Sequence, residues 1–404
     1  MIYYRRCTTL AFMLFTLFLS TNSTAQILPA KFGKGLNIKG LDSTFQLKIG
    51  FRFQSLIVAD WSLAEATQAY TADNDVTALV RRSRLKFDGW AYTPKLKYKL
   101  ELALTNIDNG GGNNDQFGNA ANIILDAHVT YNFYKNFYAR FGQGKLAGNR
   151  ERVISSGNLQ FVDRSRLNSR YTIDRDVFLQ LSHRHTIGDN FLVKESASIS
   201  SGEGKNHLTG YNGGFSYTYR LECLPFGKFQ SKGDYIGSAI KRESSPKLAI
   251  GLTYDNNNNA GRERGQIGKF IVNSEGDIVG NDLNTFFADL MFKYQELSIM
   301  MEYADKKSPL GPFVFDADET LIGEYYTGAG INVAMGYMFG KDMEIALRYT
   351  GIDAEVATDE KQYTIGFNKF FVGHKLKIQT DYTLINRDGR QNSAQWRVQM
   401  DIHF

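Results

Sequence analysis

Residues 96–105 read Leu-Lys-Tyr-Lys-Leu-Glu-Leu-Ala-Leu-Thr, so that a large apolar side chain occupies every second position. Successive side chains of a β-strand point to opposite faces of its sheet, and this period of two predicts a strand with one apolar and one polar face. Residues 343–350 and 375–384 repeat the pattern. Strands of this kind either meet in the core of a sandwich or face lipid around a closed barrel.

The connections between the strands distinguish these alternatives. The pattern predicts about sixteen strands, near residues 44–59, 77–92, 96–106, 123–134, 137–145, 176–186, 190–200, 213–224, 247–255, 283–295, 297–304, 325–340, 342–353, 361–371, 375–385 and 394–404. Short turns such as Lys135-Asn136 and Gln295-Glu296 alternate with long polar segments such as 106–122 and 255–282. This sorting predicts a transmembrane antiparallel β-barrel with short periplasmic turns and long extracellular loops. The stretch 225–246 is long where a short turn is expected, and we interpret it as an insertion.

Aromatic residues and the end of the chain agree with a barrel that faces lipid. The 404 residues include 22 Tyr, 29 Phe and 38 Gly but six Pro, which suits long uninterrupted strands. Tyr and Phe crowd around the short turns, as in 131–138, where a girdle at the lipid headgroups is expected. The last strand ends in Phe404, which resembles the signal that directs bacterial barrels to outer-membrane assembly. A secreted sandwich whose last strand happens to end in Phe is the alternative.

The N-terminus predicts export. Arg5 and Arg6 precede an apolar run, 10–19, that is too short to cross a bilayer as a helix, and small residues up to Ala25 form a cleavage site. Cleavage there leaves Cys223 as the one cysteine of the mature chain, so no internal disulfide is expected. The predicted organisation is a signal peptide (1–25), an N-terminal periplasmic segment (26–43) and an outer-membrane barrel (44–404).

Short motifs spread over most of the mature chain resemble the phosphate-selective porin O and P family. They begin with Arg-Arg-Ser-Arg-Leu-Lys-Phe-Asp-Gly at 81–89 and continue in the family's order at 141–145, 175–181, 201–206, 219–227, 301–303 and 344–349. The resemblance implies a sixteen-stranded barrel in the outer membrane of a Gram-negative bacterium, usually a homotrimer, with the third loop folded into the lumen. It also implies passive diffusion of small anions such as phosphate through a basic constriction, without a cofactor.

The charges on two neighbouring strands set a predicted register. The tight turn at Pro94 favours pairing of Asp88 with Lys99 and of Lys86 with Glu101, because opposite charges stabilise cross-strand pairs. These four lumen-facing charges then largely cancel.

Arg82 and Arg84 are the stronger candidates for a basic wall. They point to the same face as Lys86 and lie opposite Thr105 and Ala103, neither of which is an acid. A channel selects by its width and by rings of charge, so unpaired arginines there would attract anions. The alternative is that both arginines pair with acids on the first strand or on loops.

The segment 145–175 is the other concentration of positive charge. Seven bases and three acids give it a formal charge of +4, whereas the whole mature chain carries +3. The resemblance implies that this loop folds inward, and the planar guanidinium of Arg suits bidentate binding of phosphate or carboxylate oxygens. The candidate pore residues are Arg82, Arg84, Arg150, Arg152, Arg164, Arg166, Arg170 and Arg175. The alternative is that the loop arginines lie outside and bind lipopolysaccharide phosphates or carboxylates of other loops.

Other functions have less support. The sequence contains no nucleophile elbow, His-Glu-x-x-His, P-loop or dinucleotide fingerprint, so we expect no enzyme activity. A modest basic excess on an exported chain does not indicate nucleic-acid binding. His183 and His185 share one strand face near Asp174 and Asp176 and could hold a metal, but solvated histidines are the simpler interpretation, and no metal site is predicted. A structural or adhesive barrel with a plugged lumen and partner-binding loops is the second function class.

Overall fold

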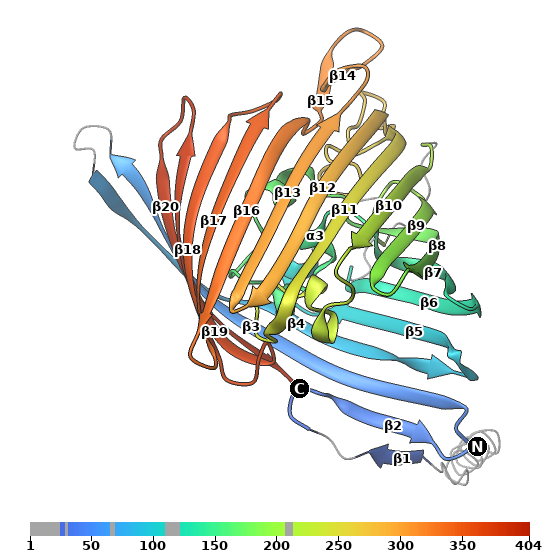
Figure 1. Cartoon of the computed structure of the whole chain (residues 1–404). Helices are drawn as coiled ribbons and strands as arrows, with labels where there is room; N and C mark the ends of the chain where they lie inside the picture. The colour runs from blue at the N-terminus through green and yellow to red at the C-terminus, as the bar shows by residue number, and fades with distance from the viewer. Residues whose placement is uncertain (1–24, 29–30, 65–68, 110–121, 207–212) are drawn as a thin grey trace, which may run out of the picture.

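Sixteen strands of the computed structural model close into a barrel, each antiparallel to the next, with β20 paired to β3 (Figure 1). The structure describes residues 25–28, 31–64, 69–109, 122–206 and 213–404. The barrel strands are β3 (Phe45–Ala64), β4 (Ala69–Ala91), β5 (Thr93–Ala103), β6 (Ile124–Tyr134), β7 (Phe137–Lys145), β8 (Arg175–Ile187), β9 (Phe191–Ser200), β10 (Ser216–Leu224), β11 (Glu243–Ala260), β12 (Asn281–Gln295), β13 (Leu297–Lys307), β16 (Gly328–Phe339), β17 (Met343–Ala354), β18 (Glu360–Phe370), β19 (Leu376–Arg387) and β20 (Ser393–His403). The predicted sixteen-stranded barrel is confirmed.

Side chains alternate between the two faces of the barrel wall, as β8 illustrates. Val177, Leu179 and Leu181 point outward and are 43%, 46% and 54% exposed, whereas Phe178 and Gln180 between them are 2% and 8% exposed. The outer surface is therefore apolar where it meets lipid. No helix among the described residues is both long and apolar enough to cross a membrane.

The short turns lie where the sequence predicts them. Lys135 and Gln295 occupy the turns that join β6 to β7 and β12 to β13, and their φ angles are 40° and 48°. A tight hairpin needs such left-handed residues because their twist matches that of the flanking strands. The sorting of turns and loops onto opposite rims follows directly from these hairpins.

Three features extend beyond the sequence prediction. β3 and β4 continue past residues 59 and 77, where backbone pairing persists without an alternating apolar pattern. A separate hairpin, β14 (Phe313–Phe315) with β15 (Leu321–Glu324), lies in the connection between β13 and β16. A second hairpin, β1 (Ala25–Leu28) with β2 (Leu36–Gly40), joins the wall through β3. Except for Ala25, the predicted signal peptide lies outside the described residues.

The segment 146–174 between β7 and β8, the inner loop, crosses the interior of the barrel. It contains α3 (Arg150–Val153), η1 (Ser156–Asn158) and α4 (Arg166–Tyr171). The hydroxyls of Ser155 and Ser165 cap η1 and α4 by accepting hydrogen bonds from backbone N–H groups. Asn149 donates to Glu302 on β13, and Asp381 on β19 accepts from the backbone N–H of Val162. The inner loop is thus fixed to strands on the far side of the barrel.

The stretch 225–246, interpreted from sequence as an insertion, ends within β11, to which its last four residues belong. The remainder, 225–242, also enters the barrel and is named here the rim segment. It contains η2 (Gln230–Tyr235). Gly237 donates its backbone N–H to the carbonyl of Asn158 at 2.9 Å, and Ser238 donates to Glu344 on β17 at 2.7 Å. Buried apolar residues of the inner loop, the rim segment and the wall form one cluster: Ile154, Leu159, Phe161, Leu192, Leu224, Phe229, Ala249, Met291, Met300, Ala334 and Ala346. Two segments therefore fill part of the lumen with a hydrophobic core.

Glycines on the inner wall allow the inner loop to approach closely. A Cβ atom at Gly336 on β16 would overlap the amide nitrogen of Gln160, and one at Gly366 on β18 would lie 3.2 Å from the ring of Phe161. Glycine is needed where another segment approaches the strand backbone this closely. The loop packs against β16–β18, which leaves the β4–β9 side less filled.

Candidate functional site

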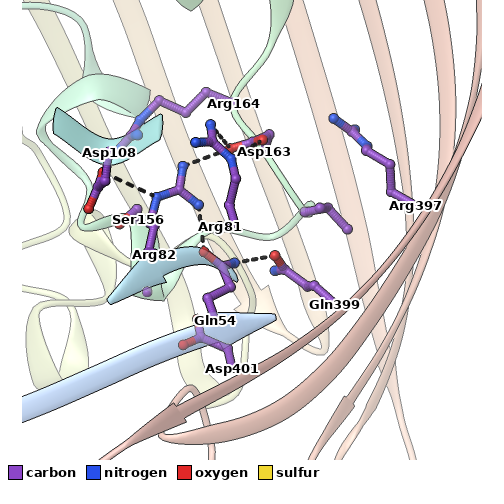
Figure 2. Close-up of polar contacts among 12 residues, drawn as sticks. Gln54, Arg81, Arg82, Asp108, Ser156, Asp163, Arg164, Arg397, Gln399 and Asp401 are labelled. Atoms are coloured by element: carbon purple, nitrogen blue, oxygen red, sulfur yellow. Dashed lines mark hydrogen bonds and ion pairs between the residues drawn. The ribbon is translucent and has the colours of Figure 1, made fainter. Parts of the chain in front are cut away.

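Arg82 is the centre of a polar network on the inner wall, which Figure 2 shows. Its guanidinium donates to Gln54 Oε1 at 2.6 Å and to Asp163 Oδ1 at 2.8 Å, and its Nε lies 3.9 Å from Asp108. Arg81 contacts the same Asp163 carboxylate at 3.2 Å. Because Asp163 belongs to the inner loop, Arg81 and Arg82 hold this loop against the wall.

Burial and the neighbouring positive charges have opposite effects on the pKa of Asp163. Burial alone would raise the pKa of Asp163, but the positive charges of Arg82 and Arg81 outweigh it and hold the pKa well below its usual range. The carboxylate therefore stays ionised at any pH near neutral, and the ion pair between wall and loop persists over the same pH range.

Arg84 corrects one interpretation of the sequence. The predicted register is confirmed, since Lys86 pairs with Glu101 and Asp88 with Lys99 along β4 and β5. Arg84, however, binds Glu101 at 2.8 Å and Asp108 at 2.6 Å. Asp108 lies in the short helix α2 (Asn106–Asn109), which folds back over the wall. The open alternative, pairing with loop acids, is what the geometry supports for Arg82 and Arg84.

Arg150 is not exposed to the pore, contrary to the sequence prediction. Its side chain is 0% exposed and bonds to Asp289 at 2.8 Å, to Glu222 at 3.2 Å and to the carbonyl of Asp234 at 2.9 Å. A buried guanidinium needs such carboxylate and carbonyl partners to offset its loss of water. Arg150 therefore joins the inner loop to the rim segment and to β10 and β12.

Arg166 and Arg170 also have anchoring contacts. Arg166 lies 3.3 Å from Glu360 on β18, with its side chain 40% exposed. Arg170 donates to the carbonyl of Val356 and stacks on the ring of Tyr326 with 4.4 Å to its centroid. Both hold α4 to the connections of the far wall.

Arg152 and Arg175 pair with acids of the same region. Arg152 donates to Asp174 at 2.8 Å, and Arg175 donates to Asp126 on β6 at 2.7 Å. Burial would raise the pKa of Asp174, yet Arg152 and Arg175 hold it well below its usual range. These ion pairs fix the two ends of the inner loop beside β6 and β8.

In the part of the chain that the structure describes, three cationic side chains, Arg140, Lys145 and Arg164, are held by backbone carbonyls and not by carboxylates. Arg164 donates to the carbonyls of Glu151 at 2.9 Å and Ile154 at 2.7 Å. Lys145 donates to the carbonyl of Arg152 at 2.6 Å and, at 3.3 Å, to the same Ile154 carbonyl.

Arg140 donates to the carbonyl of Lys145 at 2.9 Å. Among the residues that the structure describes, no carboxylate lies within ion-pair distance of Arg140, Lys145 or Arg164. Burial and the neighbouring charge of Arg152 hold the pKa of Arg164 well below its usual range. A bound anion would supply the missing negative charge at these three side chains.

Cavities connect along this side of the barrel. The largest, of about 920 Å³, lies above the inner loop and is lined by eleven Lys or Arg side chains and three acids. A cavity of about 260 Å³ follows, and Arg84, Lys145, Ser156 and Arg175 line both. A third, of about 370 Å³, shares Arg140, Ala147, Val153 and Gln180 with the second. The three cavities form a row along β4–β9, with Lys145 and Arg140 at its two junctions.

Sequence reasoning missed several lining residues. It counted Lys145 in the charge of the loop but did not choose it, and it overlooked Arg140, Lys205, Arg262 and Arg264. The parity of β7 could have found Arg140, because Ala139 and Phe141 beside it face outward. The basic residues of the long connections carry no such periodic signal.

Residues 51–403 match the model of the family described as phosphate-selective porin O and P. The chain belongs to this family. This porin is also similar to an uncharacterized protein of Aquifex aeolicus (strain VF5), 26% identical over 297 residues, which are 69% of this chain and 67% of that protein. The fold resembles an anion-selective porin from Comamonas acidovorans (TM-score 0.51, 11% identity, covering 89% of this chain and 100% of that one). It also resembles OmpF of Salmonella typhi, solved with daunomycin (TM-score 0.56, 12% identity, 89% and 98% covered).

The family and the fold identify an outer-membrane porin. Which solutes the porin admits depends on the side chains along its cavities.

Proposed function

We propose that this porin passes small anions along the β4–β9 side of the barrel, through a basic constriction at the inner loop. The observation that carries the proposal is the convergence of Lys145 and Arg164 on the carbonyl of Ile154, without a carboxylate partner among the described residues. Lys145 lines both cavities that meet there. The constriction thus combines a narrow passage with uncompensated positive charge.

Position makes these charges effective. Water and salt screen an exposed charge, whereas a charge in a narrow protein-lined passage acts over a longer range. The backbone carbonyls hold the Lys145 and Arg164 side chains in place without cancelling their charge. Binding must stay weak enough for release, so we propose a shallow series of contacts and a saturable anion current.

The other arginines have a supporting role in this proposal. Arg82, Arg84, Arg152 and Arg175 line the largest cavity and contribute to its positive potential. The ion pairs of Arg82, Arg152 and Arg175 keep the inner loop in place, and those of Arg84 hold α2 to the wall. Arg150, Arg166 and Arg170 act as anchors of the loop and do not bind solute.

Phosphate is the solute that the family's description favours. Its oxygens can accept hydrogen bonds from a lysine and from the fork of an arginine at once, which suits Lys145 with Arg164 or Arg140. We further propose a homotrimer in the membrane, as the family resemblance implies, which cross-linking in native outer membranes would test.

The test uses the double variant Lys145→Gln with Arg164→Gln in a planar bilayer. The zero-current potential in a tenfold KCl gradient should shift toward cation preference, and added phosphate should reduce the chloride current less than in the original protein. The matched control, Lys307→Gln with Lys341→Gln, removes the same formal charge from exposed positions and should leave both readouts unchanged.

Correct folding of each variant is checked by its heat-modifiable migration in gels. An unaltered potential in a folded double variant would place Lys145 and Arg164 outside the conduction path. A non-conducting original protein would instead favour the structural or adhesive barrel with a plugged lumen.

A further inference from the structure

A cluster of metal-ligating side chains lies on the outer face of the barrel. His183 and His185 belong to β8, and His183 is paired across the sheet with Glu195 on β9. His183 and His185 share the outward parity of Leu181, four and two residues before the end of β8 at Ile187. The cluster therefore sits toward the periplasmic turn, where ions of the periplasm can reach it.

The three side chains converge on one point. Nδ1 of His183 lies 2.9 Å from Glu195 Oε2, and Nδ1 of His185 lies 4.0 Å from the same oxygen. One ligand atom from each of the three residues falls within 4.8 Å of the others. Three ligands bound at about 2.0–2.1 Å around a tetrahedral ion lie about 3.3 Å apart, so small side-chain rotations complete the geometry.

The imidazole of His185 has a ring nitrogen that is free to bind an ion. Its Nδ1 is buried and has no hydrogen-bond partner among the described residues, although it is directed toward Glu195. The two imidazoles stack with centroids 5.1 Å apart, and Phe137 stacks on His183 at 4.0 Å. Stacking restricts both rings, which lowers the entropy lost when they bind an ion.

Charge at this position also favours a cation. The surrounding outer surface is apolar, with Phe133, Leu181 and Tyr219 beside the cluster. A carboxylate on the lipid-facing surface of a barrel is unfavourable unless it is neutralised. A divalent ion held by Glu195 and two neutral imidazoles neutralises it.

We propose that His183, His185 and Glu195 bind one divalent transition-metal ion, Zn²⁺ or Cu²⁺, which links β8 to β9 at the periplasmic end of the barrel. Imidazole and carboxylate ligands suit both ions, and three protein ligands leave a fourth position for water. The three side chains lie on the outer face by strand parity, and His183 and Glu195 also border the third cavity of the row.

The geometry differs from the metal hypothesis considered from sequence, in which nearby acids were Asp174 and Asp176. Asp174 binds Arg152 inside the barrel, and Asp176 accepts a hydrogen bond from the backbone N–H of Gly202 at 2.7 Å. Glu195 replaces both, because the β8–β9 register brings it beside His183.

The test measures Zn²⁺ binding to the full chain, purified in detergent without a histidine tag, by calorimetry. We expect one ion per chain, at least tenfold weaker binding for His185→Asn and Glu195→Gln, and a thermal unfolding midpoint that rises with Zn²⁺ in the original protein but not in these two variants. The matched control His128→Asn changes a histidine on the lumen side and should bind Zn²⁺ like the original protein.

Cu²⁺ provides a second readout that does not depend on stability. Its electron paramagnetic resonance spectrum should show two nitrogen ligands in the original protein and one in His185→Asn. Absence of saturable Zn²⁺ binding, or binding that survives both His185→Asn and Glu195→Gln, would overturn the proposal.

Discussion

Arginines and lysines inside this barrel fall into two groups that differ in their partners. Arg82, Arg84 and Arg150 form ion pairs with carboxylates, which largely neutralise their charges and hold segments together. Lys145 and Arg164 are oriented by backbone carbonyls. A carbonyl fixes a cation without removing its formal charge, so the second group can act on a passing anion.

Lys205 gives the pore a predicted pH dependence. Burial, together with the charge of Arg175, lowers the pKa of Lys205 to about 8, and this lysine lines the largest cavity. The lysine is charged below that pH and loses its charge above it. Anion preference, measured as zero-current potential, should therefore fall between pH 7 and pH 9.

Two variants isolate this effect. Lys205→Arg keeps its charge over the whole range and should remove most of the pH dependence, while Lys205→Gln should show the weaker preference already at pH 7. An equal decline in the original protein and in Lys205→Arg would contradict the assignment.

Adjacent residues on β8 test the two faces of the wall. Leu181 is 54% exposed on the outside, whereas Ser182 lines a cavity inside. Leu181→Arg places a guanidinium against hydrocarbon and should lower the free energy of unfolding by about 2–4 kcal/mol, since the cost is greatest near the midplane. Ser182→Arg should change it by less than about 1 kcal/mol. Urea titration of folding in lipid vesicles measures both, and equal losses would show that the faces are assigned wrongly.

For single residues, the sequence indicated which segments are rich in basic side chains but not which of these side chains lack an acidic partner. Of the eight predicted pore arginines, Arg82, Arg84, Arg152, Arg164 and Arg175 line the largest cavity. Arg150 is buried because Glu222 and Asp289 come from distant strands, and no local pattern reveals such partners. Parity within a strand can be read from sequence, whereas contacts made by a folded-in loop cannot.

Strands and turns were the predictable elements. Alternation of side chains specifies a strand, and short breaks in the alternation such as Lys135-Asn136 specify where the chain reverses, so all sixteen strands were found. The rim segment was recognised as long, but its entry into the lumen depends on contacts such as Gly237 with Asn158. Those contacts join residues far apart in the chain and leave no periodic signal.

The inner loop packs closely against β16–β18 because glycines on these strands present no side chain to it. Gly336→Ala adds a Cβ that displaces the amide of Gln160, which donates to Ser298 at 3.0 Å and Glu344 at 2.8 Å. We expect a loss of about 1–3 kcal/mol in unfolding free energy, because overpacking forces neighbours from their positions, and a noisier single-channel current.

Gly50→Ala is the matched control. A Cβ at Gly50 meets only the carbonyl oxygen of Phe404, at an ordinary 3.6 Å, so stability and current should stay close to those of the original protein. Identical currents for the Gly336 and Gly50 variants would show that the inner loop does not rest on this wall.

The whole molecule is a barrel with an unevenly filled interior. The inner loop and the rim segment meet across the lumen through Arg150 and share a hydrophobic cluster. Three cavities form a row along β4–β9, and basic side chains dominate the largest of these three. This row of cavities, with its basic side chains, is the path that we propose for solutes.

The zero-current potential of the unaltered protein across a tenfold KCl gradient tests this account most directly. We expect open channels whose potential has the sign for chloride moving faster than potassium, and whose preference weakens as salt screens the pore charges. A potential of the opposite sign, or a value of zero in well-folded open channels, would contradict an anion path lined by Lys145 and Arg164.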